Sequence, residues 1–354
     1  MSHAIELAYN GRYSVSPNPK VGCVIAHGEK IVGSGWHRQK GGAHAEIFAL
    51  QQAGNLAENS TVYVSLEPCS HYGATPPCAK ALIAAKVKKV IAATQDANPL
   101  VQGKGFAMLQ NAGIEVACGL LEKETRELNR GFFSRFERNR PYIRLKIAQS
   151  LDGKTALKNG VSQWITNNES RLDVQEQRAI SCAILTGVGT ILADNPRLNV
   201  REIETFRQPV RVVVDSNLST PPNANICIDN QRTILACLPN AQNKDYPDNV
   251  EILRIDANEN QQIDLKLLLT RLSEMGFGEV LVEAGAILSG ALLQENLVDE
   301  LLIYQAPIIL GNTARSSFRL PEKTDLSNLT RWHLVDSKTF GDDIRLTFKF
   351  NTNF

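Results

Sequence analysis

The amino-acid sequence predicts an α/β protein with two domains. At 354 residues the chain is longer than a single hydrophobic core usually supports, which favours two domains. Strand-like apolar runs alternate with helical patterns in two successive stretches, and such alternation is typical of layered α/β domains. A basic segment, residues 128–140, separates the stretches and ends before Pro141, which disfavours helix at the preceding residue. We therefore expect domains at residues 1–140 and 141–354, with this segment as the linker.

Each expected element follows from the spacing of apolar side chains. Strands are short runs of β-branched and aliphatic residues, and helices repeat apolar residues three or four positions apart. In the first domain, strands are expected at 21–26, 61–66, 89–93 and 114–117, and helices at 43–53, 78–85 and 105–112. In the second, strands are expected at 142–148, 183–186, 210–215, 233–236, 280–283 and 300–306, and helices at 168–180, 265–274 and 286–295. Surface loops are expected at 197–209, 220–230 and 239–249.

Charge and hydropathy argue against two classes of partner. Lys and Arg total 38 and Asp and Glu total 37, so no overall field attracts nucleic acid or an anionic membrane. No apolar run is long enough to span a bilayer, and the first ten residues lack the apolar core of a secretory signal. We expect a soluble, cytoplasmic protein that holds anionic ligands with local groups.

The cysteines divide into two groups. Their odd total of seven, scattered along the chain, argues against a disulfide framework. Free cysteine behaves as a small buried hydrophobe, and this is the expectation where it lies in an apolar run. Cys69 and Cys78 differ, because both follow proline and accompany a histidine motif. The other five are expected to be structural: Cys23, Cys118, Cys182, Cys227 and Cys237.

One imidazole and two thiols fit a catalytic zinc site. His44 opens an expected helix, Cys69 follows the strand 61–66, and Cys78 follows two prolines where a helix would begin. Three protein ligands leave the fourth tetrahedral position open for water, whereas structural zinc sites use four protein ligands. We therefore expect His44, Cys69 and Cys78 to bind Zn²⁺.

Glu46 is the expected proton carrier of this site. It lies two residues after His44, so on a helix it points beside the metal instead of ligating it. Two thiolates already cancel the charge of the zinc ion, so a general acid and base is needed, usually contributing about 10² to 10⁴ in rate. The order His-x-Glu, Pro-Cys and a second Cys is the pattern of zinc deaminases.

Two alternatives remain open for the metal. In the first alternative, His37 and His71 are metal ligands in a different arrangement. We expect His71 instead to face substrate or solvent. A structural zinc module used for assembly would need a fourth protein ligand and would give Glu46 no function.

The run His44, Ala45, Glu46 with Pro68, Cys69 and Cys78 resembles the deaminase domain of the bifunctional riboflavin-biosynthesis deaminase/reductases. Nucleoside and transfer-RNA deaminases usually have two residues between the cysteines, whereas this chain has eight, residues 70–77. Tetrahedral zinc holds its two sulfurs about 4 Å apart. The loop 70–77 must therefore fold back, and we expect it to line the substrate's entrance.

The resemblance implies a cytidine-deaminase-like, three-layer α/β domain that acts on an aminopyrimidine. Segments 17–22 and 96–99 resemble the same family. Asn18 offers a donor and an acceptor to a pyrimidine, and with His71 it is a candidate substrate contact. Alternatively, Asn18 is a turn residue between two prolines.

The second domain contains two glycine turns between an expected strand and a helix. Gly285 follows the strand 280–283, and Gly187 and Gly189 follow the strand 183–186. Such turns allow backbone to approach a phosphate at a helix N-terminus. Neither matches G-x-G-x-x-G, so the standard Rossmann fingerprint is absent, and each turn alone is more often only a tight turn.

Segments 141–166, 184–198 and 282–293 resemble the reductase domain of the same family, which implies a dihydrofolate-reductase-like fold and NADPH as cofactor. Lys146 and Asp194 would lie nearest the reacting ribose. The resemblance places cofactor contacts at Ala148, Trp164, Thr190, Asp194, Ser216 and the Gly285 turn. It places substrate contacts at Ser162, Arg178, Leu198, Arg201 and Glu283.

These roles are chemically reasonable. Arg178 and Arg201 offer forked donors to a phosphate, and Trp164 offers a flat face to a ring. Alternatively, Asp194 caps a turn with the Asn and Pro that follow it, and Arg178 is a solvated charge on a helix.

The expected function is zinc-dependent deamination of 2,5-diamino-6-(5-phosphoribosylamino)pyrimidin-4-one, followed by NADPH-dependent reduction of the ribosyl group to ribityl. The alternative is a nucleoside or tRNA deaminase with a degenerate C-terminal domain. Near-neutral charge and the loop 70–77 count against this alternative. The expected partner is a small phosphoribosylated pyrimidine, without nucleic acid or membrane, and we expect a homo-oligomer, either a dimer or a tetramer.

Overall fold

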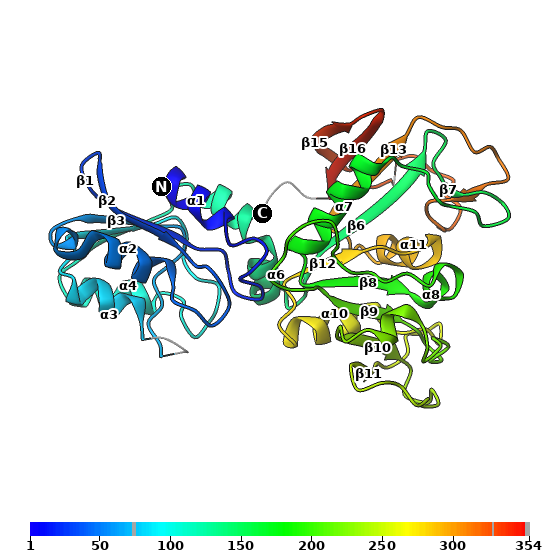
Figure 1. Cartoon of the computed structure of the whole chain (residues 1–354), viewed down its shortest axis with the longest axis horizontal. Helices are drawn as coiled ribbons and strands as arrows, with labels where there is room; N and C mark the ends of the chain where they lie inside the picture. Colours follow the sequence, from blue (N-terminus) through cyan, green and yellow to red (C-terminus); the bar gives the residue numbers. More distant parts are fainter. Residues whose placement is uncertain (73–75, 328, 351–354) are drawn as a thin grey trace. The chain divides into compact units, whose positions relative to one another are not determined.

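The computed structural model describes residues 1–72, 76–327 and 329–350. The chain forms two compact units, one from Met1 to Asn139 and the other starting at Arg140. Each unit alternates strands with helices and has a sheet of its own (Figure 1). In the described residues, no helix is long and apolar enough to cross a membrane.

The first unit is built on a five-stranded sheet with the order β2-β1-β3-β4-β5. Strand β1 pairs antiparallel with β2 and with β3, whereas β3, β4 and β5 are parallel. The carboxyl ends of the three parallel strands therefore lie at one edge of the sheet. The strands are β1 (Gly22–His27), β2 (Lys30–Trp36), β3 (Thr61–Val64), β4 (Lys89–Ala92) and β5 (Glu115–Cys118).

Helices cover both faces of this sheet, which gives three layers. On one face, Ala45 and Ala49 of α2 pack in the core with Ile25 of β1. On the other face, a Cβ on Gly22 would lie 1.9 Å from the carbonyl oxygen of Ala4, so only glycine allows α1 to approach β1 so closely. The helices are α1 (Ser2–Tyr9), α2 (Ala45–Ala53), α3 (Cys78–Ala84), α4 (Lys104–Asn111), α5 (Glu122–Leu128) and α6 (Arg130–Arg138), with a 3-10 turn, η1 (Gly54–Ala57), after α2.

The prediction of a linker at residues 128–140 is wrong, because most of this segment forms α6. Phe133 of α6 is fully buried, and the helix belongs to the first unit. Phe132, Phe133 and Phe136 are spaced so that they share one side of a helix, while arginines occupy the rest. The basic composition therefore concealed an amphipathic helix.

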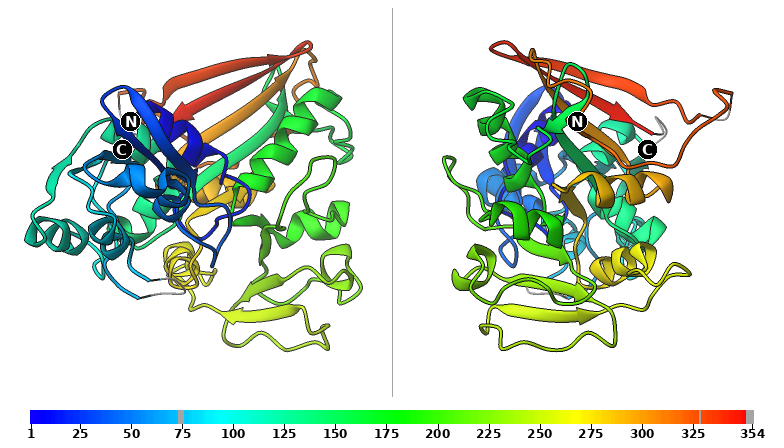
Figure 2. Two further views of the ribbon diagram at one scale, coloured as in Figure 1. Left: turned by 60° about the vertical axis from the view of Figure 1, so that its left-hand side comes forward. Right: turned by 90° about the vertical axis from the view of Figure 1, so that its right-hand side faces the viewer.

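The second unit contains a nine-stranded sheet with the order β11-β10-β9-β8-β12-β6-β13-β16-β15. Neighbouring strands from β11 to β13 are parallel, and β16 and β15 add an antiparallel hairpin (Figure 2, red). The strands are β6 (Tyr142–Ser150), β8 (Ala183–Gly187), β9 (Val210–Val214), β10 (Thr233–Cys237), β11 (Val250–Arg254), β12 (Glu279–Val282), β13 (Glu300–Ala306), β15 (His333–Phe340) and β16 (Asp343–Lys349). A separate two-stranded sheet pairs β7 (Lys154–Ala156) with β14 (Arg315–Ser316).

Two hydrophobic cores lie on opposite faces of the larger sheet. Leu268 of α10 packs with Ile143 and Val280 on one face. Ile191 of α8 packs with Ile184 and other side chains on the second face. The helices of this unit are α7 (Asn168–Ile180), α8 (Val188–Asp194), α9 (Asn225–Ile228), α10 (Leu265–Glu274) and α11 (Ala286–Gln294).

All strands and helices expected from the sequence are present, with small differences at their ends. The prediction of a loop at 220–230 was only partly right, because this segment contains the short helix α9. Six strands in the described residues were not expected from the sequence, namely β2, β7, β11, β14, β15 and β16. Strands β2 and β15 were missed for different reasons. Gly33 and Gly35 of β2 lie against α2 and interrupt its apolar pattern, whereas seven of the eight residues of β15 are exposed and give no alternation.

None of the seven cysteines forms a disulfide, as the sequence predicts. Cys23, Cys227 and Cys237 are buried. The expectation of burial is wrong for Cys118, which is exposed at the last position of β5, and Cys182 is only partly buried. Edge strand β5 has one neighbour, so its end stays open to solvent.

Candidate functional site

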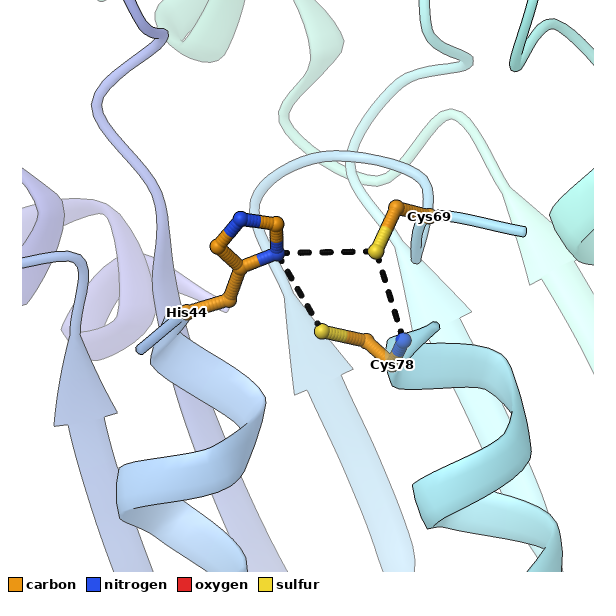
Figure 3. Close-up of side chains that lie close together, drawn as sticks. All are labelled: His44, Cys69 and Cys78. Carbon is orange, nitrogen blue, oxygen red and sulfur yellow. Dashed lines mark hydrogen bonds between the residues drawn. The ribbon is translucent and has the colours of Figure 1, made fainter. Parts of the chain in front are cut away.

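Three ligand-type side chains converge in the first unit (Figure 3). His44 is the N-cap residue of α2, Cys69 follows β3, and Cys78 is the first residue of α3. The Nδ1 atom of His44 lies 3.5 Å from Sγ of Cys69 and 3.3 Å from Sγ of Cys78. The three ligand atoms all lie within 4.8 Å of one another, close enough for one ion to contact them together.

The segment that carries Cys69 is anchored by its neighbour Glu67. The Oε2 atom of Glu67 accepts hydrogen bonds from the backbone N–H groups of Asp96 and Gly103, and Oε1 accepts one from Gly105 at 2.9 Å. A Cβ on Gly105 would lie 1.9 Å from the carbonyl oxygen of Pro68, so this approach requires glycine. Buried Glu67 therefore fixes the position of the segment that ends at Cys69.

The chemistry of this donor set suits zinc. Hydrogen bonds from the Cys78 thiol, from His44 and from the Cys78 backbone N–H lower the pKa of Cys69, although burial opposes the change, while the hydrogen bond to Cys69 and burial raise the pKa of Cys78. A thiolate is the form of cysteine that ligates metal. Zinc prefers imidazole nitrogen and thiolate sulfur, so the residues present fit this ion.

Glu46 lies in the first turn of α2, beside this group, and is only 3% exposed. Burial, followed by the nearby Cys69 charge, raises the pKa of its carboxyl to about 7. Among the described residues, its Oε2 atom is buried without a hydrogen-bond partner. A carboxyl with such a pKa can both take and release a proton near neutral pH.

Asn18, His37 and His71 occupy different environments near the ligand group. The Nδ2 atom of Asn18 lies 3.2 Å from Nε2 of His37, whose ring packs edge-on against His44. Burial lowers the pKa of His37, and His71 is exposed. In the described part of the chain neither histidine joins the ligand group, which has three members, so no fourth ligand of a structural zinc module is found there.

The expected entrance loop 70–77 is described only in part. Gly73, Ala74 and Thr75 of that loop lie outside the described residues. Tyr72, the last described residue before them, is exposed, and Lys80 donates a hydrogen bond to the Tyr72 hydroxyl at 3.3 Å.

In the second unit, the structure brings Lys146, Arg178 and Glu283 together. They come from β6, from α7 and from the residue after β12. The Nε atom of Arg178 lies 2.6 Å from Glu283, and Nζ of Lys146 lies 3.9 Å from the same carboxylate. Burial alone would raise the pKa of Glu283, but Arg178, Lys146 and Arg201 lower it to about 2.

Arg178 is buried, so the alternative of a solvated helix charge is wrong. Its Nε and Nη2 atoms donate to Glu283, and Nη1 donates to the carbonyl oxygen of Asn199 at 3.0 Å. These bonds use three of the five guanidinium N–H donors, one on each nitrogen. Arg201, in contrast, is exposed: its Nη1 atom donates a long hydrogen bond to Asn199 at 3.4 Å, and its Nε atom lies 3.5 Å from Glu202.

The remaining candidates of the second unit are spread over several loops. Trp164 is 64% exposed, with the guanidinium of Arg171 4.4 Å from its ring centroid. Asp194 ends α8 and is exposed, and in the described residues its side chain makes no hydrogen bond that would cap a turn. Ala148 lies on β6, Ser162 in an exposed loop, Thr190 on α8, Leu198 in a buried left-handed turn, Ser216 after β9, and Gly285 at the N-cap of α11.

Sequence reasoning missed two buried anchors of the first unit. Glu67 had a signal, because it directly precedes the Pro-Cys pair. Asn129 had none: its side chain pairs with both backbone groups of Lys20, at 2.7 and 2.9 Å, although 109 positions separate the two residues.

Known proteins resemble the whole chain. The model for the cytidine and deoxycytidylate deaminase zinc-binding region matches residues 1–94, and the model for the RibD C-terminal domain matches residues 141–346. The riboflavin biosynthesis protein RibD of Haemophilus influenzae is 44% identical, over 98% of this chain and 96% of that protein.

Two solved structures agree with this assignment. RibD of Acinetobacter baumannii, form 1, has a TM-score of 0.91 and 44% identity, covering 98% of this chain and 97% of that one. A diaminohydroxyphosphoribosylaminopyrimidine deaminase/5-amino-6-(5-phosphoribosylamino)uracil reductase of Thermotoga maritima has a TM-score of 0.88 and 33% identity, covering 99% and 97%.

These findings confirm the predicted α/β fold class, with a cytidine-deaminase-like domain followed by a reductase domain. They also confirm both predicted cofactors, zinc and NADPH, and do not favour the nucleoside or tRNA deaminase alternative. The chain therefore belongs to the RibD family of riboflavin biosynthesis proteins, as a bifunctional enzyme with a zinc-dependent deaminase domain and an NADPH-dependent reductase domain.

Proposed function

We propose that His44, Cys69 and Cys78 bind the zinc ion, and that Glu46 carries protons during hydrolytic deamination of 2,5-diamino-6-(5-phosphoribosylamino)pyrimidin-4-one. The observation that supports this proposal is the convergence of three ligand atoms within 4.8 Å beside a buried carboxyl. The Thermotoga maritima relative is named as a deaminase of the same substrate class.

When bound, zinc lowers the pKa of a water molecule so that the water can attack a ring carbon at neutral pH. Glu46 takes the proton released by this water and delivers it to the amine that leaves as ammonia. Its pKa of about 7 suits both transfers, because neither protonation state dominates near neutral pH. Asn18 and His71 contact the substrate in this proposal.

In the second domain we propose that Lys146 and Asp194 act at the ribosyl group of the deaminated aminouracil. NADPH, when bound, supplies the hydride that converts this group to ribityl. Lys146 donates a proton to the ribose ring oxygen as the bond between C1′ and that oxygen breaks, and the hydride adds to C1′ of the ring-opened, protonated imine. Burial lowers the pKa of Lys146, which makes the proton transfer easier. Proposed cofactor contacts are Ala148, Trp164, Thr190, Asp194, Ser216 and Gly285, and proposed substrate contacts are Ser162, Arg178, Leu198, Arg201 and Glu283.

Glu283 also affects how Arg178 and Lys146 can bind the substrate. Its carboxylate holds both cations, with Arg178 2.6 Å away and Lys146 3.9 Å away. Arg178 uses three of its five N–H donors, two for Glu283 and one for Asn199, so a phosphate that bound Arg178 would meet the two donors that remain on Nη1 and Nη2. Arg201 is exposed and is therefore the more accessible phosphate contact of the two.

One experiment tests both activities. The purified, metal-analysed protein is incubated with the diaminopyrimidinone ribotide, with and without NADPH, and the products are identified by mass. We expect the deaminated aminouracil ribotide without NADPH and the ribityl product with it. Unchanged substrate in both samples would contradict the proposal.

We also propose a cytoplasmic homo-oligomer, either a dimer or a tetramer. Light scattering after gel filtration tests the oligomeric state, and a monomer at micromolar concentration would contradict it. Cell fractionation tests the compartment.

A further inference from the structure

Two hydrogen bonds connect Asn18 to the backbone beside the metal ligand group. The Nδ1 atom of His37 lies 3.0 Å from the carbonyl oxygen of Ala43, and Nε2 lies 3.2 Å from Nδ2 of Asn18. The His37 residue is only 3% exposed, and its ring lies edge-on to His44, with centroids 5.3 Å apart. His37 therefore links a candidate substrate contact to the segment that carries a candidate zinc ligand.

The partners of His37 fix the direction of both hydrogen bonds. A carbonyl oxygen can only accept, so Nδ1 of His37 carries the ring proton. An amide NH₂ group can only donate, so Nε2 accepts from Asn18. The Oδ1 atom of Asn18 is thus left as an acceptor, and in the described residues no other group donates to it.

The backbone of the Asn18 loop is held by a different residue. The Oδ1 atom of Asn129 accepts from the backbone N–H of Lys20 at 2.7 Å, and Nδ2 donates to the carbonyl oxygen of Lys20 at 2.9 Å. Asn129 is only 2% exposed. Because Asn129 places the loop, His37 controls chiefly the rotation of the Asn18 amide.

We propose that His37 is a positioning residue that holds Asn18 with Oδ1 facing the pyrimidine, so that the deaminase site selects rings presenting an N–H or amino donor there. This inference deepens the proposed function and rests on contact between Asn18 and the pyrimidine. Without His37, the amide can turn and present NH₂ to the substrate's own donor. Two donors that face each other leave both unpaired, and this mismatch weakens binding.

Two substitutions separate the two hydrogen bonds of His37. The amide of His37→Gln reaches the position of Nε2 and can still accept from Asn18. The amide of His37→Asn reaches the position of Nδ1, so it can donate to Ala43 but cannot accept from Asn18. We expect His37→Asn to raise the KM for ammonia release about tenfold and His37→Gln less than about threefold. Zinc content and kcat should stay within about twofold in both.

A double-mutant cycle with Asn18→Ala tests whether His37 acts through Asn18. In the Asn18→Ala protein, adding His37→Asn should change KM by less than about twofold, since the amide it orients is gone. Equal effects of His37→Asn in both backgrounds would overturn the inference. So would a larger effect of His37→Gln than of His37→Asn, which would make the Ala43 bond the important one.

A direct measurement does not depend on catalysis. Nitrogen-15 NMR of the zinc-loaded protein, with His37 assigned from the His37→Gln spectrum, should show a protonated Nδ1 and an unprotonated Nε2. A protonated Nε2 would overturn the inference.

The kinetic controls distinguish this inference from the proposed function. If the parent protein releases no ammonia, the proposed function fails and the inference fails with it. If ammonia is released but Asn18→Ala keeps the parental KM, the proposed deaminase reaction stands, whereas the substrate contact of Asn18 and the inference built on it are wrong.

Discussion

The two domains position their candidate residues in contrasting ways. In the deaminase domain, His44, Cys69 and Cys78 have ligand atoms within 4.8 Å of one another. In the reductase domain, Lys146 and Glu283 approach each other, but Trp164 and Asp194 are exposed on different segments. The candidate residues of the deaminase domain therefore lie close together, whereas those of the reductase domain are spread over several loops of a large sheet.

The difference reflects what each site binds. A metal ion requires its ligands to contact it at about 2 Å, so the ligands must also lie near one another. A dinucleotide and a sugar phosphate are long, so the groups that hold them need not touch. A short motif therefore identifies the first kind of site, whereas the second is identified only from resemblance over long segments.

Independence of the two sites can be tested most strongly at Glu46. In the proposed mechanism Glu46 performs both proton transfers, so Glu46→Gln should reduce ammonia release by about 10⁴, the upper end of the range for general acid–base catalysis. Reduction of the aminouracil ribotide by NADPH should be unchanged. Zinc content and the rates of both half-reactions are measured separately, with exposed Glu58→Gln as the matched control. Loss of both activities in a folded variant would break the comparison.

Lys146 provides the converse test in the reductase domain. Lys146→Ala should reduce NADPH oxidation by about 10³, because one proton donor is lost, while ammonia release persists. The exposed residue Lys158 supplies the control variant Lys158→Ala. Asp194→Ala should have the same selectivity for the reductase reaction. Parental NADPH oxidation by Lys146→Ala would remove Lys146 from the proposed mechanism.

The buried cluster around Glu283 sharpens the comparison, because it contributes to stability as well as to the site. Glu283→Gln leaves buried Arg178 and Lys146 without a counter-ion, which should cost about 3 kcal/mol in the unfolding of the reductase domain. The control Glu274→Gln breaks a pair with Arg271 whose side chains are about half exposed, and it should change stability by less than about 0.5 kcal/mol. Equal destabilisation by both variants, measured by denaturant unfolding, would show that the cluster around Glu283 contributes no more to stability than an exposed ion pair.

The same cluster gives a pH dependence. The folded pKa of Glu283 is lowered from 4.5 to about 2. Its contribution to stability is therefore fully present above pH 4.5 and is lost as the pH falls through 2. Stability of the parent protein should fall more steeply than that of Glu283→Gln across this window. Parallel pH profiles of the two proteins would contradict this assignment.

The smallest expected effect is at Glu67. Glu67→Gln replaces one accepting oxygen by an NH₂ group that faces backbone donors, which loosens the segment carrying Cys69. Residues that support metal ligands typically affect affinity about 10- to 100-fold, and we expect about tenfold weaker zinc binding. Competition with a chelator measures it, and affinity for NADPH should be unchanged. Parental zinc affinity would show that the deaminase site does not depend on this anchor.

The sequence predicted much of the fold because its strands are strongly patterned. The expected helices 168–180 and 265–274 match α7 and α10 to the residue. Two of the failures were local conflicts between composition and burial: the arginines of α6 suggested a linker, and the exposed strand β15 lacked any alternation. Neither conflict is visible without knowing which face each segment buries.

At the candidate sites, the sequence itself determined the donor set of the deaminase domain, since imidazole and thiolates beside a carboxylate are chemically specific. Only the tertiary structure decided that Arg178 donates to Glu283 from 105 positions away and that the amide of Asn18 lies 3.2 Å from the ring of His37. The physical reason is that ligand type and spacing are encoded locally. Burial, ion pairing and the rotation of an amide depend on neighbours that the folded chain brings from distant positions.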